Sequence, residues 1–328
     1  MSFADLLDRR LILISGKGGV GKTVVSSALG LLAARAGKRV LLVKLDDQGQ
    51  TARLFDVPAL GDRVTPLCDG VAGIHLDPVT IVSDYFQRQL RVRRLVRHIT
   101  SSRLFQSWFR VTPAIKEMIC LGKVWDLVEE RTFWRKHPVW DLVVFDAPAT
   151  GHGLGLLRLP QQAGRLLMGP MRTSALGVQA LLEDPAQTSL VVVTIPEEMP
   201  VNEAIHFVTE ARRHLEIDLA GVVLNQAHPE RLADEPATPA LAAAGEPALA
   251  ALLGDGAPPD AVVEALDEAR GRARARAELT RRYGDQLRAA VDLPVVELPR
   301  LFARSFGLAE LEQVAAALAA VLAVEAPA

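Results

Sequence analysis

The strongest constraint on the fold is a glycine-rich stretch near the N-terminus, residues 11–30, which reads LILISGKGGVGKTVVSSALG. Residues 16–23 fit the pattern G-x-x-x-x-G-K-[ST], between a short apolar run and an Ala/Leu-rich segment. In this pattern, glycines allow backbone N–H groups to point into a concave anion site at the N-terminus of a helix. We therefore predict a phosphate-binding loop between a buried strand and a helix.

The side chains of this loop predict a nucleotide and a metal ion. Lys22 is expected to reach the β- and γ-phosphates, and the Thr23 hydroxyl is expected to bind Mg²⁺. A glycine-rich turn with an unrelated lysine is the alternative, and the eight-residue match in its strand–loop–helix setting argues against it. The predicted nucleotide-binding residues of the loop are Gly16, Lys17, Gly18, Gly19, Val20, Gly21, Lys22, Thr23 and Val24.

Composition is that of an ordinary soluble protein. The 328 residues are 49% hydrophobic and 23% charged, and the formal net charge of −2 gives no general attraction to nucleic acid or anionic lipid. Cys68 and Cys120 are the only cysteines, which favours free thiols in a reducing compartment. The N-terminus does not resemble a signal peptide, and the apolar run 314–324 is too short to span a membrane. We expect a cytoplasmic protein.

Short apolar runs alternate with longer helical patterns along the chain. Near-continuous Val, Leu and Ile runs indicate strands buried on both faces, and the helical stretches between them imply parallel crossovers. The predicted strands are Leu11–Ile14, Arg39–Leu45, Gly73–Leu76, Trp140–Phe145, Ser189–Ile195, Leu219–Leu224 and Pro294–Leu298. We therefore predict a doubly wound, mostly parallel α/β sheet, the P-loop NTPase fold class, with ligands at the carboxyl ends of its strands.

We expect the chain to form a single domain over residues 1–328. Helical patterns at about 80–136 and 160–185 predict a helical subdomain inserted into the sheet layer. The section at about 227–290 begins rich in Pro, Ala and Gly and predicts a loose connection that ends in a charged helix, roughly Pro259–Ala290.

Two further strand ends carry acidic side chains. Asp46 follows the second predicted strand and Asp146 follows the fourth, so both open on the same sheet edge as the phosphate-binding loop. Asp46 is the candidate to position the attacking water, although a helix cap or turn is the plain alternative. Asp146 fits a carboxylate of the Mg²⁺ shell, acting through water, and Gly151 gives the freedom that a γ-phosphate sensor needs.

The segment KGGVGKT (17–23) resembles the deviant Walker A motif of the dimeric ATPases that include MinD, ParA, the nitrogenase iron protein and ArsA. This resemblance implies that Lys17 reaches across a dimer interface to the partner's nucleotide, as an arginine finger does in trans. The catalytic residues implied are then Asp46, Lys17 and Lys22.

Other segments are similar to one branch of these ATPases, ArsA together with the ATPase that targets tail-anchored membrane proteins. DAPATGHGLGLLRLP (146–160) resembles its switch II, and GVVLNQ places Asn225 where that branch has an asparagine that reads adenine. ELPRLFARSFGLAEL (297–311) is similar to its adenine-side segment, which implies nucleotide contacts from Pro299 and Leu301.

The sequence also departs from this branch. Switch I reads DDQGQ (46–50), closer to the D-P-Q-G of partition ATPases, and a threonine is missing beside Asp146. No C-x-x-C occurs, so no zinc is expected, and the cysteines that ArsA uses for metalloid have no counterparts.

Together these features predict an ATP- and Mg²⁺-dependent dimeric switch. The partner would be an identical chain or an ArsA-like paralogue, because the chain carries one nucleotide cassette. We expect it to target or chaperone a hydrophobic or membrane-protein client. An energising subunit of an anion or arsenite pump, or a positioning ATPase of the ParA and MinD kind, are the alternatives. No specific nucleic-acid binding is expected.

Overall fold

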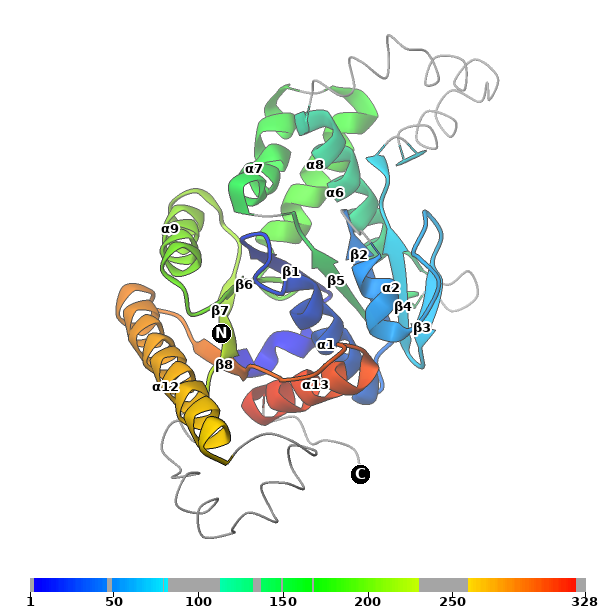
Figure 1. Ribbon diagram of the computed structural model, residues 1–328. Coiled ribbons are helices and arrows are strands. Elements are labelled where there is room, and N and C mark those ends of the chain that lie inside the picture. The colour runs from blue at the N-terminus through cyan, green and yellow to red at the C-terminus, as the bar shows by residue number, and fades with distance from the viewer. Residues whose placement is uncertain are drawn as a thin grey trace, which may run out of the picture.

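An eight-stranded sheet forms the centre of the protein in the computed structural model (Figure 1). The structure describes residues 3–45, 49–78, 80–81, 113–131, 137–148, 150–166, 168–229 and 259–322. The strand order is β3-β4-β2-β5-β1-β6-β7-β8, and all neighbours are parallel except β3 and β4. The strands are β1 (Leu11–Gly16), β2 (Val40–Lys44), β3 (Thr65–Cys68), β4 (Val71–His75), β5 (Leu142–Asp146), β6 (Thr188–Thr194), β7 (Leu219–Ala227) and β8 (Val295–Pro299). The predicted doubly wound, mostly parallel α/β fold is confirmed.

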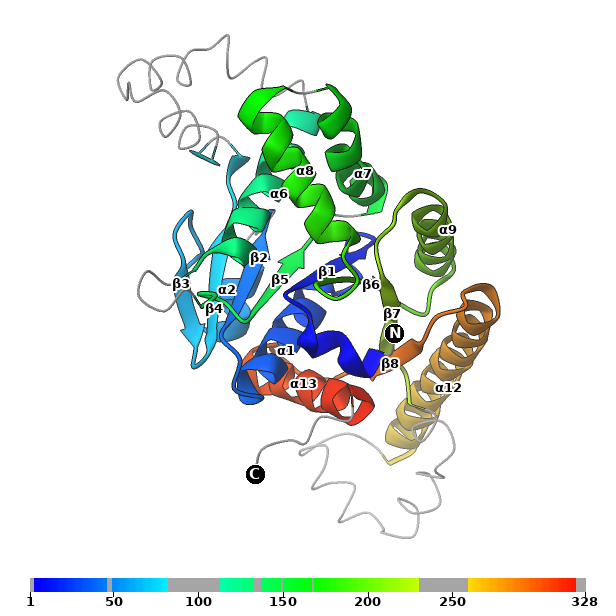
Figure 2. The same ribbon diagram turned by 180° about the vertical axis from the view of Figure 1, so that it is seen from behind.

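Helices cover both faces of this sheet (Figures 1 and 2). Helices α1 and α13 and the 3₁₀ helix η1 lie on one face, and α6, α7, α8, α9 and α12 lie on the other. Their bounds are η1 (Phe3–Asp8), α1 (Lys22–Arg35), α2 (Gln50–Phe55), α6 (Pro113–Glu129), α7 (Thr150–Leu166), α8 (Gly169–Glu183), α9 (Glu198–His214), α12 (Pro259–Ala290) and α13 (Leu308–Leu322). Within the described ranges, every helix is too short or too polar to cross a membrane.

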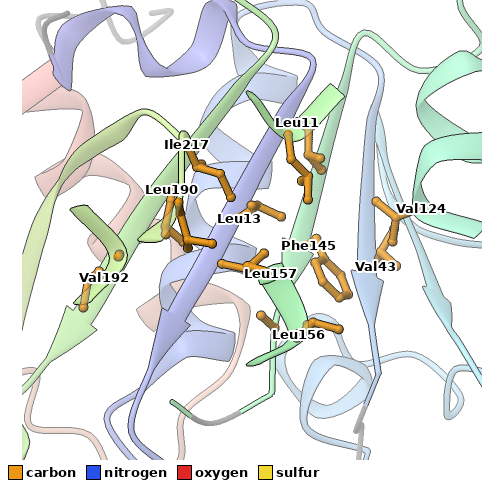
Figure 3. Close-up of a cluster of buried hydrophobic side chains, with 14 of the residues drawn as sticks. Leu11, Leu13, Val43, Val124, Phe145, Leu156, Leu157, Leu190, Val192 and Ile217 are labelled. Atoms are coloured by element: carbon orange, nitrogen blue, oxygen red, sulfur yellow. The ribbon is translucent and has the colours of Figure 1, made fainter. Parts of the chain in front are cut away.

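The two hydrophobic clusters follow from the alternation of side chains along each strand. In β1, Leu11 and Leu13 point to one face, and Ile12 and Ile14 point to the other, all fully buried. Figure 3 shows the first cluster, in which Leu13 lies among side chains from neighbouring strands and from α7. Because β1 is central and buried on both sides, it can hold the loop that follows it in a fixed place.

Helices α6, α7 and α8 pack together on the face of the sheet that carries the first hydrophobic cluster (Figure 1). Gly177 on α8 lies so close to Trp125 on α6 that an added Cβ would come within 2.7 Å of the indole ring. The predicted helical regions at about 80–136 and 160–185 therefore contribute to one helical group, although residues 82–112 and 132–136 lie outside the described residues. The predicted single domain over 1–328 remains a prediction.

Most predicted elements match the structure, and one strand was missed. Each of the seven predicted strands is present with ends shifted by at most a few residues, and the charged helix spans Pro259–Ala290 as expected. The Pro-rich connection before it, residues 230–258, lies outside the described residues. The missed strand is β3, which contains Pro66 and pairs antiparallel with β4 at the edge of the sheet. Proline is tolerated in strands mainly at such edges, which is why the sequence pattern did not indicate a strand.

We expect Leu13→Ala to destabilise the fold strongly, because Leu13 is fully buried in β1. Removing such a side chain costs about 2–5 kcal/mol in the free energy of unfolding. Leu279→Ala on α12 is the matched control, since Leu279 is 39% exposed, and its expected cost is within about 0.5 kcal/mol. Chemical denaturation measures both variants. An equal loss of unfolding free energy in the two variants would contradict the conclusion that β1 lies at the centre of the core.

Candidate nucleotide and metal site

The phosphate-binding loop is held between the end of β1 and the start of α1. Gly21 precedes the first residue of α1, and its φ of 90° lies in the left-handed region, where other residues are strained. A Cβ on Gly21 would lie 2.2 Å from Nδ2 of Asn225. That amide donates a hydrogen bond of 2.9 Å to the carbonyl oxygen of Val20. Asn225, at the end of β7, therefore braces the loop directly.

A cavity of about 610 Å³ opens beside this loop. It is lined by Gly18, Gly19, Gly21, Lys22, Thr23, Val24, Gln50, Arg53, Leu54, Asp146, Ala147, Pro148 and Phe306. Six of these residues belong to the predicted phosphate-binding loop, and Asp146 ends the neighbouring strand β5. The N-terminus of α1, loop glycines and basic side chains meet here, which is the arrangement that binds phosphate groups. A second cavity beside α6 shares no residue with this site.

Lys22 lies over its own loop. Its Nζ donates to the carbonyl oxygens of Gly16 and Lys17, at 3.1 and 3.2 Å. The ammonium group is thereby kept at the mouth of the cavity, where an incoming phosphate can replace the weaker carbonyl partners with a charged one. The role of Lys22 in phosphate binding stays a prediction, and its place in the lining of the cavity is the one that this role requires.

The predicted metal ligands meet at one corner of the cavity. The Thr23 hydroxyl lies 2.9 Å from Oδ2 of Asp146 and 3.1 Å from Oε1 of Gln50. A hydroxyl, a carboxylate and an amide oxygen are the hard oxygen ligands that Mg²⁺ prefers, either directly or through water. The residues present therefore fit the ion, and Thr23 and Asp146 would hold it.

A buried lysine shares this corner, and the sequence analysis did not identify it. Lys44, the last residue of β2, is 3% exposed and forms an ion pair with Oδ2 of Asp146. Its Nζ also donates to the Thr23 hydroxyl at 2.6 Å. The only signal in the sequence was that a lysine ends an apolar strand, two residues before Asp46. A lysine at such a position is usually interpreted as a solvated side chain, so it did not stand out.

Lys17 points away from the phosphate cavity of its own chain. Its Nζ lies 2.8 Å from Oε1 of Glu203 on α9, and both side chains are about one-third exposed. Lys17 is absent from the described lining of the cavity, whereas Gly18, the next residue, and Lys22 are present. The two lysines of the loop therefore have different partners, and Glu203 is a further residue that the sequence analysis missed.

The other predicted site residues lie at the same edge of the sheet, with one exception. Gly151 is the second residue of α7, close behind Asp146. Pro299 is the cross-strand neighbour of Ala227, two residues after Asn225, so the predicted adenine-side segments are adjacent. Leu301 follows, partly buried against the core. Asp46 lies outside the described residues, so its role remains a prediction.

Arg53 and Phe306 also line the cavity and were not predicted to do so. Arg53 is an exposed residue of α2, the short helix that follows the predicted switch I. Its cationic side chain adds to the positive field that favours phosphate binding. No local pattern distinguishes Arg53 from other surface arginines, because its approach to the loop depends on how α2 packs against α1.

Comparison with known proteins shows the family of the chain. The sequence profile of the family described as anion-transporting ATPase matches residues 9–176 and 168–243. The chain belongs to this family. It is therefore an ATPase, and the resemblance to the ArsA branch is confirmed.

Individual relatives carry different names. The ATPase BagA of Mycobacterium tuberculosis is 31% identical over 246 residues, covering 72% of this chain and 70% of that protein. ATPase ASNA1 homolog 1 of Paramecium tetraurelia is 25% identical, with 66% and 74% covered. An arsenical pump-driving ATPase of Acidiphilium multivorum is 27% identical, with 69% of this chain and 41% of that protein covered.

We expect Gly21→Ala to weaken ATP binding. An L-residue in the left-handed region costs about 1–2 kcal/mol, and the added Cβ would also displace the Asn225 amide that braces Val20. The expected loss of affinity is at least about tenfold. Titration with a fluorescent ATP analogue, read by anisotropy, measures it.

The matched control is Gly271→Ala on the exposed surface of α12, where an added Cβ meets nothing within 4 Å. Its ATP affinity is expected to equal that of the wild type. Lys22→Ala should abolish binding in the same assay, because it removes the charge at the cavity mouth. Wild-type affinity in Gly21→Ala would show that the loop tolerates another conformation.

Proposed function

We propose that this ATPase works as a dimeric switch, in which each chain completes the nucleotide site of the other, and that it acts on a hydrophobic or membrane-protein client. The observation that carries the dimeric part is the direction of Lys17. Its side chain pairs with Glu203 on the outer helix α9, whereas Lys22, five residues later, faces the cavity of the same chain. A lysine that serves a neighbouring chain must point outward in this way.

The residues of the site divide the work of phosphate transfer. Lys22 and the loop N–H groups bind and orient the β- and γ-phosphates, and Asp46 orients the attacking water. When bound at Thr23 and Asp146, Mg²⁺ supplies positive charge to neutralise the phosphate oxygens. Lys17 from the second chain adds a further cation at the γ-phosphate. Asn225, Pro299 and Leu301 would contact the adenine side.

The helical group supports a client of apolar character. We call the group formed by Thr23, Asp146 and Gln50 the metal corner. Helix α7 begins four residues after Asp146, so a change at the metal corner is close to the start of this helix. At the other end of α7, Met168 is 87% exposed, and Leu176 on α8 is 45% exposed. Exposed large apolar side chains on a helical surface are typical of sites that hold an apolar segment of another protein.

The pump alternative has less support from the thiols. Relatives of this chain include an arsenical pump-driving ATPase, but metalloid binding needs thiolates close together. Cys120 is fully buried, and burial raises the pKa of its thiol to about 12, so it stays protonated at neutral pH. Cys68 lies on the opposite side of the sheet, where its side chain packs against the other hydrophobic cluster.

A positioning ATPase of the MinD kind is supported by the D-x-Q-G of switch I. Its membrane-binding version requires a basic amphipathic helix that adheres to lipid. Helix α13 has the acidic Glu310 in its first turn and packs its apolar side chains against α1, so it is not a helix of that kind. We favour the client-binding function because of the exposed apolar side chains of the helical group.

Mixing two inactive variants tests the dimeric mechanism. Lys17→Ala should still bind ATP but lose hydrolysis by about 10³-fold or more, as for other cations supplied in trans. Asp46→Asn should also be inactive, because the water is no longer oriented. An equimolar mixture is expected to recover activity, since mixed dimers contain one site with Asp46 of its own and Lys17 from the other chain.

Size-exclusion chromatography with two differently tagged variants establishes that mixed dimers form. Glu203→Gln serves as the comparison variant, because it removes the partner of Lys17 and leaves Lys17 itself in place. Full dimer exchange without recovered hydrolysis would mean that Lys17 serves its own nucleotide. If the physiological partner is a paralogue, the two variants are placed one in each chain of that pair.

The client is tested with an apolar helical peptide of about 20 residues, the length that spans a membrane. We expect Asp46→Asn protein with ATP to bind the labelled peptide, and Met168→Asp to weaken this binding at least about tenfold because a charge enters the apolar surface. Fluorescence anisotropy measures it. Met199→Asp on α9 is the control, since Met199 is 61% exposed outside the helical group. Equal effects of the two substitutions would argue against this surface.

A further inference from the structure

The most unusual feature of the described residues is the buried ammonium group of Lys44. β2 reads VLLVK, and Lys44 is the cross-strand neighbour of Asp146 in the parallel register with β5. Both side chains are almost fully buried: 3% of the Lys44 side chain and 6% of the Asp146 side chain are exposed. A buried charge is tolerated only with a partner, and here the partner is fixed by the sheet itself.

The ammonium group uses the same two oxygen groups that are expected to hold the metal. Lys44 pairs with Oδ2 of Asp146 and donates to the Thr23 hydroxyl at 2.6 Å. Asp146 and Thr23 also contact each other at 2.9 Å, so the three groups form one cluster, which Gln50 joins through its contact with the Thr23 hydroxyl. No other carboxylate of the described residues contacts this cluster.

Two cations cannot share these oxygens without strong repulsion. The energy between charges rises as the effective dielectric constant falls, and this corner is largely buried. A lysine head is a compact charge on a flexible four-carbon stem, so it can change partners without movement of the strand. The phosphates of a bound nucleotide would provide that alternative partner at the adjacent cavity.

We propose that Lys44 is a resident counter-cation of the metal corner, which keeps divalent cations out of the nucleotide-free protein. The metal then enters only together with a nucleotide, whose phosphates bring enough negative charge to hold both cations. This inference rests on the proposed role of Thr23 and Asp146 in Mg²⁺ binding. The proposed role of Lys44 adds an order of binding, in which the nucleotide-free protein does not bind a metal ion before it binds ATP.

The test measures Mn²⁺ binding to the nucleotide-free protein by electron paramagnetic resonance, since Mn²⁺ accepts the same oxygen ligands as Mg²⁺. Lys44→Met is expected to bind Mn²⁺ at least about tenfold more tightly than the wild type, because it removes the repelling charge and frees the carboxylate. Lys44→Arg keeps the charge and should bind as weakly as the wild type. In the double variant Lys44→Met/Asp146→Asn the gain should disappear.

Lys38→Met is the matched control. Lys38 pairs with Asp8, outside the metal corner, and its substitution makes the same change in net charge. Equal Mn²⁺ affinity in wild type and Lys44→Met would overturn the proposal, as would an equal gain in Lys38→Met. Wild-type protein with ATP is measured in parallel. Failure of Mn²⁺ to bind there contradicts the metal role of Thr23 and Asp146, whereas an unchanged Lys44→Met contradicts only the role of Lys44.

Lys44→Met also leaves the Asp146 carboxylate buried without its partner, so the variant can unfold. In that case the proposal predicts that millimolar Mn²⁺ restores a cooperative thermal transition, because the metal ion replaces the ammonium group beside Asp146. Circular dichroism with and without Mn²⁺ measures this. An unfolded Lys44→Met that Mn²⁺ does not restore would overturn the proposal.

Discussion

The site depends on the parallel register of three neighbouring strands. Ile14 of β1 and Lys44 of β2 are both cross-strand neighbours of Asp146 in β5, so three strand ends form one row. Each is followed by a segment that contributes to the site: the phosphate-binding loop, the predicted switch I and the start of α7. Backbone hydrogen bonds of the sheet therefore fix the positions from which the functional side chains begin. The segments after the strands contribute the functional side chains, and the sheet that holds them is rigid because it is buried on both faces.

Charge balance explains how this frame can be stable with ionised groups inside it. The Lys44–Asp146 pair compensates the two most buried charges near the cavity, while Lys22 uses carbonyl oxygens of its own loop. A triphosphate would bring negative charge to a place where Lys22, Arg53 and the N-terminus of α1 supply positive charge. In the nucleotide-free protein, the charged side chains of Lys44, Asp146 and Lys22 therefore have partners within the protein itself. A bound nucleotide would provide new partners for the cationic groups.

The sequence predicted the parts of the site that depend on local pattern. The loop, Thr23 and Asp146 could be proposed as site residues because a glycine motif, and an acidic residue at the end of an apolar strand, are recognisable within a few residues of sequence. Contacts between distant segments could not be located. Lys44 and Asp146 are 102 residues apart, and Asn225 braces Val20 from 205 residues away. The edge strand β3 was missed for a related reason, since Pro66 is acceptable only because its strand has a single neighbour.

The two lysines of the loop connect the nucleotide to different parts of the molecule. Lys22 donates to the carbonyl oxygens of Gly16 and Lys17, which belong to its own loop between β1 and α1. Lys17 binds Glu203, so its position depends on α9, which also packs against α7. Asp146 lies at the root of α7, whose far end is next to the exposed Met168. The loop and the metal corner are thus linked to the helical group along two routes, through α9 and through α7. Under the proposed function, a change of partner at Lys17 or at Asp146 would therefore reach the helices that carry the exposed apolar side chains.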